Sequence, residues 1–106
     1  MNYRYSPKFT KKISEVGFGA WQLGGTGTWG YMSKEEGMNL VHEALKKGVN
    51  FFDTAPGYGN GNSELILGET LVNNRDEVFI NTKIGHGPNG EYEFSEEGIK
   101  NSINNY

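Results

Sequence analysis

Short apolar runs alternate with helix-forming segments along this chain, and this alternation restricts its fold more than any other feature. Strands are predicted at residues 13–23, 49–54 and 78–84, and helices at residues 34–48, 63–71 and from 95 onward. Strands that alternate with helices form parallel sheets joined by right-handed crossover connections. The sequence therefore predicts an α/β fold built from three consecutive β/α units.

The second and third predicted helices carry further local signals. Ser63 and Ser95 are expected to cap them at their N-terminal ends. In the second helix, Leu67 and Leu71 are expected to face the core, and Gly68 to let the helix approach its neighbour closely. In the third helix, the spacing predicts one apolar face, formed by Ile99, Ile103 and Tyr106.

The first twelve residues precede this pattern and carry two short aromatic and basic segments around a Ser-Pro pair. They could form a small hairpin in which Tyr3 and Tyr5 pair against Phe9. The other interpretation is an ordered lead-in that packs on the rest of the protein. A chain of 106 residues forms one domain at most. We expect that domain to comprise the hairpin at 1–12 and the β/α units at 13–106.

The composition excludes several classes of function. The formal net charge of −3 argues against nucleic acid or an anionic membrane surface as a partner. Because the chain has no cysteine, disulfides, thiolate–zinc sites and thiol nucleophiles are excluded. His42 has no second ligand near it in the helical pattern, so no metal site is expected. No signal-peptide pattern or apolar run of about 18 residues is present, and we therefore expect a cytoplasmic protein.

A glycine-rich stretch contains the letters G-x-G-x-x-G, at Gly25, Gly27 and Gly30. A dinucleotide-binding fingerprint needs a strand that runs directly into the first glycine and a helix that begins within the motif. Here the predicted helix begins only after Ser33, which forms a capping signal with the glutamate three residues later. We therefore interpret the match as chance, and the stretch as a mobile loop at the mouth of a site.

Polar side chains follow two of the predicted strands at the points where each strand ends. Asp53 ends the second apolar run, Tyr58 lies in the glycine-rich loop that follows, and Lys83 ends the third run. The carboxyl ends of parallel strands lie at one edge of a sheet, where catalytic side chains are presented. Alternation also places Asp53 and Lys83 on the same face. We expect the three side chains to converge; the alternative is a buried Asp–Lys ion pair with Tyr58 as a loop anchor.

The end of the first predicted strand carries two small residues, Gly19 and Ala20, which would let a ligand or another backbone approach closely. Trp21 follows them, and it fits either a core position or the wall of a pocket. In the second loop, Gly57 and Gly59 flank the tyrosine and permit turns that other residues resist.

Three segments together resemble the N-terminal part of the aldo-keto reductase family: GAW, FFDTAPGYG with the SE-x-x-x-G that follows it, and VFINTKIG. The combination is far more specific than a single glycine motif, and the resemblance extends to the last residue. It implies that the chain holds the first three units of a (β/α)8 TIM barrel, which is incomplete here. It also implies an oxidoreductase that uses NADPH, or alternatively NADH, to reduce aldehydes and ketones.

The resemblance assigns roles to individual residues. Asp53, Tyr58 and Lys83 match three of the four catalytic residues of the family. The fourth is a histidine after the fourth strand, which would lie beyond this chain, and His86 does not match it by motif. The residues expected to contact the cofactor are Gly19, Ala20, Trp21 and Asp53. With a small carbonyl substrate, Tyr58 would donate its proton to the developing alkoxide, with Lys83 as its cationic neighbour and Asp53 as the anchor of Lys83.

Three strands of eight cannot close a barrel, so two sheet edges would stay open. One hypothesis is that the chain is a truncated front part of an oxidoreductase and is inactive alone. The other is that it is a non-catalytic assembly unit, which pairs its edges with copies of itself or with a complementary fragment. The sequence does not identify the substrate.

Overall fold

The computed structural model describes residues 1–25, 29–86 and 91–104. The main elements are three helices and five short strands within these ranges, with 3-10 turns between them. In chain order they are β1 (Tyr3–Arg4), β2 (Ile13–Ser14), β3 (Phe18–Gly19), η1 (Trp21–Gly24), α1 (Lys34–Lys46), β4 (Phe51–Asp53), η3 (Tyr58–Gly61), α2 (Asn62–Leu71), η4 (Val72–Asn74), β5 (Phe79–Asn81) and α3 (Glu96–Asn104).

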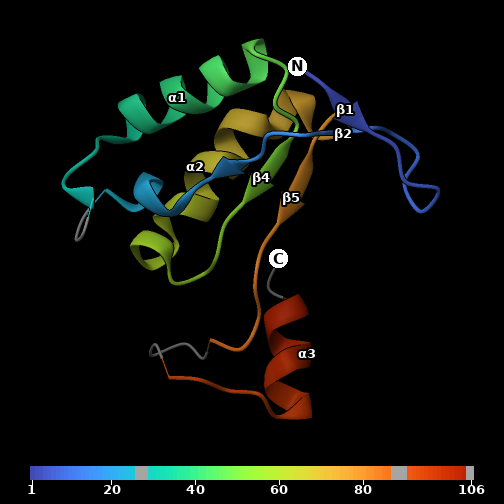
Figure 1. Ribbon diagram of the computed structural model, residues 1–106. Helices are drawn as coiled ribbons and strands as arrows, with labels where there is room; N and C mark the ends of the chain where they lie inside the picture. The colour runs from blue at the N-terminus through green and yellow to red at the C-terminus, as the bar shows by residue number, and fades with distance from the viewer. Residues whose placement is uncertain (26–28, 87–90, 105–106) are drawn as a thin grey trace.

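A parallel sheet with the order β3-β4-β5 forms the centre of the molecule (Figure 1). Phe18 pairs with Phe52, and Asp53 pairs with Gly19 on one side and Asn81 on the other. Helix α1 connects β3 to β4, and α2 connects β4 to β5, which is the predicted β/α alternation. The α/β prediction is therefore confirmed, although each strand is shorter than predicted.

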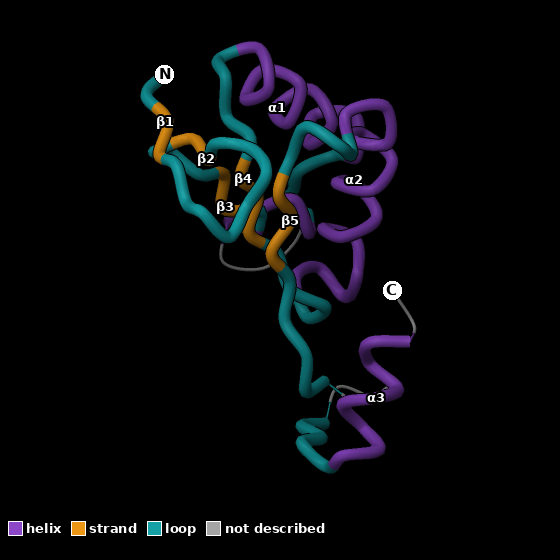
Figure 2. The backbone as a smooth tube through the Cα atoms, turned by 90° about the vertical axis from the view of Figure 1, so that its right-hand side faces the viewer, coloured by secondary structure: helices purple, strands orange, loops and turns teal. Residues whose placement is uncertain are grey.

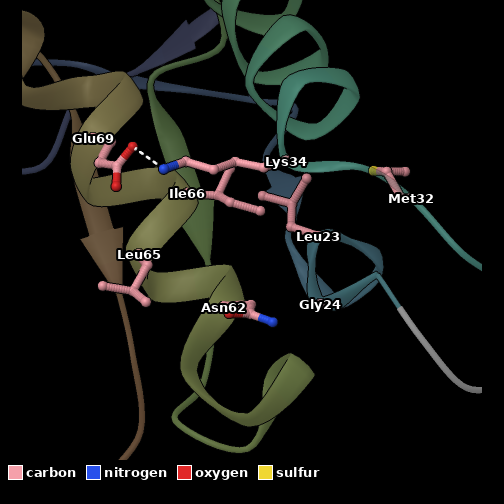
Figure 3. A pocket seen from close by; sticks show the side chains of 8 residues that line it. All are labelled: Leu23, Gly24, Met32, Lys34, Asn62, Leu65, Ile66 and Glu69. Atoms are coloured by element: carbon pink, nitrogen blue, oxygen red, sulfur yellow. Dashed lines mark ion pairs between the residues drawn. The ribbon is translucent and has the colours of Figure 1, made fainter.

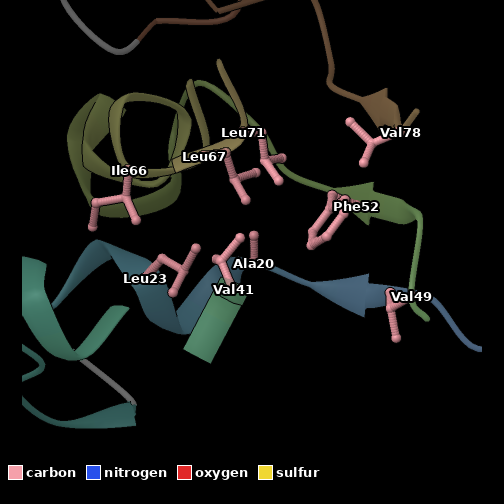
Figure 4. Close-up of a cluster of buried hydrophobic side chains, with 9 residues drawn as sticks. All are labelled: Ala20, Leu23, Val41, Val49, Phe52, Ile66, Leu67, Leu71 and Val78. Carbon is pink, nitrogen blue, oxygen red and sulfur yellow. The ribbon is translucent and has the colours of Figure 1, made fainter. Parts of the chain in front are cut away.

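The hydrophobic core lies on one side of this sheet, where α1 and α2 cover it (Figure 2). Side chains from the strands, from η1 and from both helices form a single cluster (Figure 4). Phe52 lies in its centre with no exposed surface, and Leu67 and Leu71 face it from α2 as predicted. Because side chains alternate along a strand, the burial of Phe52 places Asp53 on the opposite, open face.

The N-terminal hairpin exists, but its pairing differs from the prediction. Strand β1 pairs antiparallel with β2, so that Tyr3 lies opposite Ser14. Phe9 instead packs edge-on against the ring of Phe79, with 5.1 Å between the ring centroids. The predicted single strand at 13–23 is wrong, because its first part belongs to the hairpin and its last part forms η1.

Asn50 explains why the strand divides there. Its side-chain carbonyl accepts a hydrogen bond from the Ser14 backbone N–H at 2.8 Å, and its own backbone N–H donates to Ser14 Oγ at 3.1 Å. Its amide also donates to the Lys12 carbonyl at 2.8 Å. These hydrogen bonds connect the hairpin to the residue just before β4. Residues 13 and 14 therefore pair with β1 in the hairpin and do not extend β3.

The two sheet-covering helices begin in different ways. At α1 the predicted capping box is present, since Ser33 Oγ accepts from the Glu36 N–H and the Glu36 carboxylate accepts from the Ser33 N–H. Ser63, predicted to cap α2, is instead buried inside the first turn, and Gly61 occupies the cap position with φ +92°. Gly68, predicted to allow close helix packing, is exposed and has nothing within 4 Å of the place of a Cβ.

Ser63 is buried because it joins three elements through hydrogen bonds. Its hydroxyl donates to the carbonyl of Ala20 at 2.7 Å, and it accepts from the Thr54 hydroxyl at 2.9 Å. Residue 20 precedes η1, residue 54 follows β4, and Ser63 itself lies in α2. The hydroxyl pair therefore fixes the loops at the carboxyl ends of two strands against the start of a helix.

We predict that Ser63→Ala destabilises the protein by about 1–3 kcal/mol, because the Ala20 carbonyl and the Thr54 hydroxyl would both lose a buried partner. Urea unfolding followed by circular dichroism measures the change. Ser102→Ala, a serine substitution in α3, is the control and should stay within about 0.5 kcal/mol of the wild type. Equal unfolding free energies for Ser63→Ala and the control would contradict the structural role of this hydroxyl.

Helix α3 stands apart from the sheet in both views (Figures 1 and 2). Its predicted cap is present, since Ser95 Oγ accepts a hydrogen bond from the Gly98 N–H at 3.0 Å. Ile99 is half-buried and Ile103 is 58% exposed, so the apolar face expected of this helix is largely uncovered. Tyr106, which we placed on the same face, lies outside the described residues.

Candidate active site

The structure brings Asp53, Tyr58 and Lys83 together at the carboxyl ends of β4 and β5. The Lys83 ammonium donates to Asp53 Oδ2 at 3.1 Å and to the Thr54 carbonyl at 2.8 Å, and it lies 3.5 Å from the Tyr58 hydroxyl. The same ammonium lies 5.0 Å from the centre of the Tyr58 ring. One cation therefore links a carboxylate to a phenol, which is the convergence predicted from the sequence.

This cluster is open to solvent. The side chains of Lys83 and Asp53 are 44% and 38% exposed, so the pair is not the buried ion pair that we considered as the alternative. A half-exposed pair contributes little to stability, because water and salt screen it. Stability of the fold therefore does not explain why this ion pair lies at the edge of the sheet.

The electrostatics of the pair keep both groups ionised at neutral pH. The hydrogen bond from Asn81 lowers the pKa of Asp53, burial opposes this, and Lys83 lowers it further, with a net result below the ordinary 3.8. Burial lowers the pKa of Lys83, but contacts with Asp53 and Tyr58 outweigh it and raise the value above 10.5. The stability that Asp53 contributes to the folded state is thus lost as the pH falls through the lowered pKa of Asp53. The stability that Lys83 contributes is lost as the pH rises through the raised pKa of Lys83.

The loop that carries Tyr58 is held by contact between two glycines. A Cβ on Gly24 would lie 2.4 Å from the Cα of Gly59, and a Cβ on Gly59 would lie 2.0 Å from the Cα of Gly24. Gly59 also has φ +58°, which favours glycine. Gly57, in contrast, has an ordinary φ of −77°. The backbones of the turns η1 and η3 thus pack directly against each other. Because Tyr58 begins η3, this contact helps to position Tyr58 at the edge of the sheet.

The predicted cofactor contacts divide into exposed and buried residues. Trp21 is 52% exposed, stacks on Tyr58 with ring centroids 6.0 Å apart, and meets Trp29 edge-on at 5.7 Å. Gly19 is exposed with open space above it. Ala20 has no exposed surface, its N–H donates to the Asp53 carbonyl and its carbonyl accepts from a buried serine. The side chain of Ala20 therefore belongs to the hydrophobic core, and its contact with a cofactor stays a prediction. Trp21 is not a core residue, because half of its surface is exposed.

The dinucleotide-fingerprint letters have no matching structure in the described residues. Gly25 follows the turn η1 rather than a strand, and both Gly25 and Gly30 have positive φ, of 78° and 80°. The next helix begins only at Lys34. Rejection of the motif is confirmed at these two positions, while Gly27 and its two neighbours in the expected mobile loop lie outside the described residues.

His86 lies beside the loop of Tyr58. Its ring is 5.4 Å from that of Tyr92, with which it forms an antiparallel bridge, and its Nε2 would be 3.3 Å from a Cβ on Gly57. Its Nδ1 is buried and has no hydrogen-bond partner in the part of the chain that the structure describes. These contacts make His86 a packing residue of this loop.

Sequence reasoning missed Asn81 and Thr54 as parts of the site. Asn81 donates to Asp53 Oδ1 at 2.5 Å, and the Thr54 carbonyl accepts from Lys83. The sequence did indicate Asn81 as a candidate, because it lies two residues before Lys83 and side chains at that spacing share one face of a strand. No signal existed for Thr54, since it contributes a backbone carbonyl.

A pocket of about 210 Å³ lies elsewhere, between α2, η1 and the start of α1 (Figure 3). Leu23 and Ile66 form part of its apolar wall, and an ion pair of 2.5 Å between Lys34 and Glu69 lies at its border. None of the predicted catalytic residues lines it. Within residues 1–25, 29–86 and 91–104, no group of three metal-ligating side chains occurs, and no helix is long and apolar enough to span a bilayer.

Comparison with known proteins identifies the family. The family model described as "Aldo/keto reductase family" matches residues 15–106. The chain belongs to the aldo-keto reductase family, as its sequence segments indicated.

Individual relatives agree with this. The chain is 40% identical to an NADH-specific methylglyoxal reductase of Escherichia coli over 75 residues, which cover 69% of this chain and 23% of that protein. It is 39% identical to an L-galactose dehydrogenase of Arabidopsis thaliana over 95 residues, which cover 87% of this chain and 29% of that protein. Both names denote oxidoreductases.

Solved structures share the fold. The holo form of the aldo-keto reductase AKR11C1 from Bacillus halodurans matches with a TM-score of 0.79 and 25% identity, covering 98% of this chain and 34% of that one. An incomplete barrel therefore fits the three parallel strands. The chain spans from about a quarter to about a third of the length of the relatives it matches.

Proposed function

We propose that this chain carries part of the active site of an NAD(P)H-dependent reductase of aldehydes and ketones. The observation that carries the proposal is the connected set of Asp53, Lys83 and Tyr58, with the Lys83 ammonium 3.1 Å from the carboxylate and 3.5 Å from the phenol. A cation beside a half-buried phenol equips that phenol to transfer a proton to an oxygen of a ligand. We further propose that the protein acts in the cytoplasm on a small carbonyl substrate.

A nicotinamide cofactor, when bound, would supply the hydride that reduces the carbonyl carbon. Tyr58 donates its proton to the carbonyl oxygen as negative charge develops there, so that an alcohol forms. Lys83 stabilises the negative charge left on the phenol oxygen, and Asp53 keeps the ammonium in place through a charge-assisted hydrogen bond. A proton from solvent then restores Tyr58.

The exposed surface beside Tyr58 fits a flat cofactor ring. Trp21 presents half of its surface there, and Gly19 leaves open space at the neighbouring strand end. These two residues and the Asp53 carboxylate are the groups that would hold the nicotinamide end. One relative is named for specificity toward NADH, and this supports NADH as an alternative to the NADPH that we propose.

We propose that the 106 residues alone do not turn over substrate, because the part of the chain that the structure describes supplies three parallel strands of the barrel. A second candidate function is a non-catalytic assembly unit. It is favoured by the two edges of the sheet, β3 and β5, which pair with no further strand among the described residues, because open edges pair readily with other chains.

Titration of NADPH and NADH into the 106-residue chain tests both candidates. Saturable quenching of Trp21 and Trp29 fluorescence is the expected result if part of the cofactor site is preformed, because Trp21 lies at the proposed nicotinamide position. Trp21→Phe should remove most of the quenching, whereas Trp29→Phe should retain it. Absence of binding, with a mass above one chain by light scattering, would favour the assembly unit and contradict the cofactor site.

A further inference from the structure

Asn81 donates a side-chain hydrogen bond to the Asp53 carboxylate from the neighbouring strand. The two residues lie directly opposite each other on β5 and β4, and the Asn81 amide donates to Asp53 Oδ1 at 2.5 Å. The other oxygen, Oδ2, accepts from Lys83 at 3.1 Å. A carboxylate can rotate about its last bond, so a donor fixed on one oxygen determines where the second oxygen points.

We infer that Asn81 is a positioning residue of the proposed reductase site: it holds one oxygen of Asp53, so that the other oxygen keeps the Lys83 ammonium beside Tyr58. This inference rests on the proposed function, because the position of Lys83 matters for catalysis only if Tyr58 is the proton donor.

The surroundings of Asn81 favour this role over a merely structural one. Its side chain is exposed and lies on the open face of the sheet, away from the hydrophobic core. The pairing of the strands does not need it, because its backbone carbonyl already accepts from the Thr54 N–H at 2.8 Å. Among the described residues, the charged group that acts on Asp53 is Lys83, which in turn contacts Tyr58. The Asn81 side-chain amide thus holds the Asp53–Lys83 ion pair in place and is not needed for the pairing of the strands.

The test measures the titration of the Asp53 carboxyl carbon by NMR in the full 106-residue chain. In Asn81→Ala we expect the pKa of Asp53 to rise toward its ordinary 3.8, because the hydrogen bond that lowers it most is lost. Asn81→Asp should raise it further, since it places a second carboxylate against Oδ1. Asn74→Ala is the control, because it removes an amide donor 3.0 Å from Glu77 and should leave Asp53 unchanged.

A second readout separates positioning from general damage. The thermal midpoint of Asn81→Ala at pH 7 should stay close to that of the wild type, and the nuclear Overhauser contacts between the Lys83 and Tyr58 side chains should weaken. An unchanged Asp53 pKa in both Asn81 variants would overturn the inference, as would an equal shift in the Asn74 control. None of these readouts needs turnover, so the proposed function can fail in an activity assay while the role of Asn81 in holding Asp53 stands.

Discussion

Replacement of Tyr58 by phenylalanine should lower the rate of carbonyl reduction by about 10²–10⁴-fold, the usual contribution of a positioned general acid. The substitution keeps the ring, and hence the stacking on Trp21 at 6.0 Å between ring centroids. It removes only the hydroxyl that lies 3.5 Å from the Lys83 ammonium. Substrate would still bind beside Trp21, but no side chain would supply the proton, so the turnover number should fall far more than the Michaelis constant rises.

The assay needs a closed barrel. Residues 1–106 can replace the matching part of the Bacillus halodurans aldo-keto reductase, of which they cover 34% with a TM-score of 0.79. Oxidation of NADPH or NADH is then followed by absorbance with a small aldehyde. Tyr5→Phe in the same chimera is the control, because Tyr5 is 70% exposed in the N-terminal segment. Retention of more than a tenth of the wild-type rate by Tyr58→Phe would contradict its role as proton donor.

The position of the site could be predicted from the sequence because it depends on periodicity. Asp53 and Lys83 each end an apolar run, and in a parallel sheet such ends meet. The alternation of side chains along a strand also predicts on which face of the sheet Asp53 lies. Because Phe52 is buried, its neighbour Asp53 must lie on the opposite face. The position of Tyr58 followed less directly, because a loop residue is placed by its contacts rather than by a repeat.

The errors arose where a tertiary contact overrode a local signal. Ser63 has the residue type of a helix cap, but its hydroxyl is used by the Ala20 carbonyl and the Thr54 hydroxyl, so Gly61 takes the cap position. The strand predicted at 13–23 divides because Asn50, far along the chain, bonds to Ser14. Neither partner is visible from the local pattern of the sequence.

Substitution of Phe52 by alanine should destabilise the protein by about 3–5 kcal/mol, the usual cost of removing a buried aromatic side chain. Phe52 has no exposed surface, and its ring lies 5.7 Å from that of Phe18 on the neighbouring strand. A chain of this length has a total stability of about 5–15 kcal/mol. The variant should therefore be largely unfolded in moderate urea, as measured by circular dichroism.

Phe51→Ala provides a matched control, because it removes the same side chain from the adjacent position, on the opposite face of β4. Phe51 is only half-buried, and its ring approaches Gly17 rather than the helices. We expect its cost to be less than half that of Phe52→Ala, since less apolar surface leaves water there when the chain folds. Equal costs would contradict a core on one side of the sheet. Equal losses of stability in the two variants would also mean that the open face of the sheet is covered in solution. A mass above that of one chain by light scattering would then indicate association between copies of the chain.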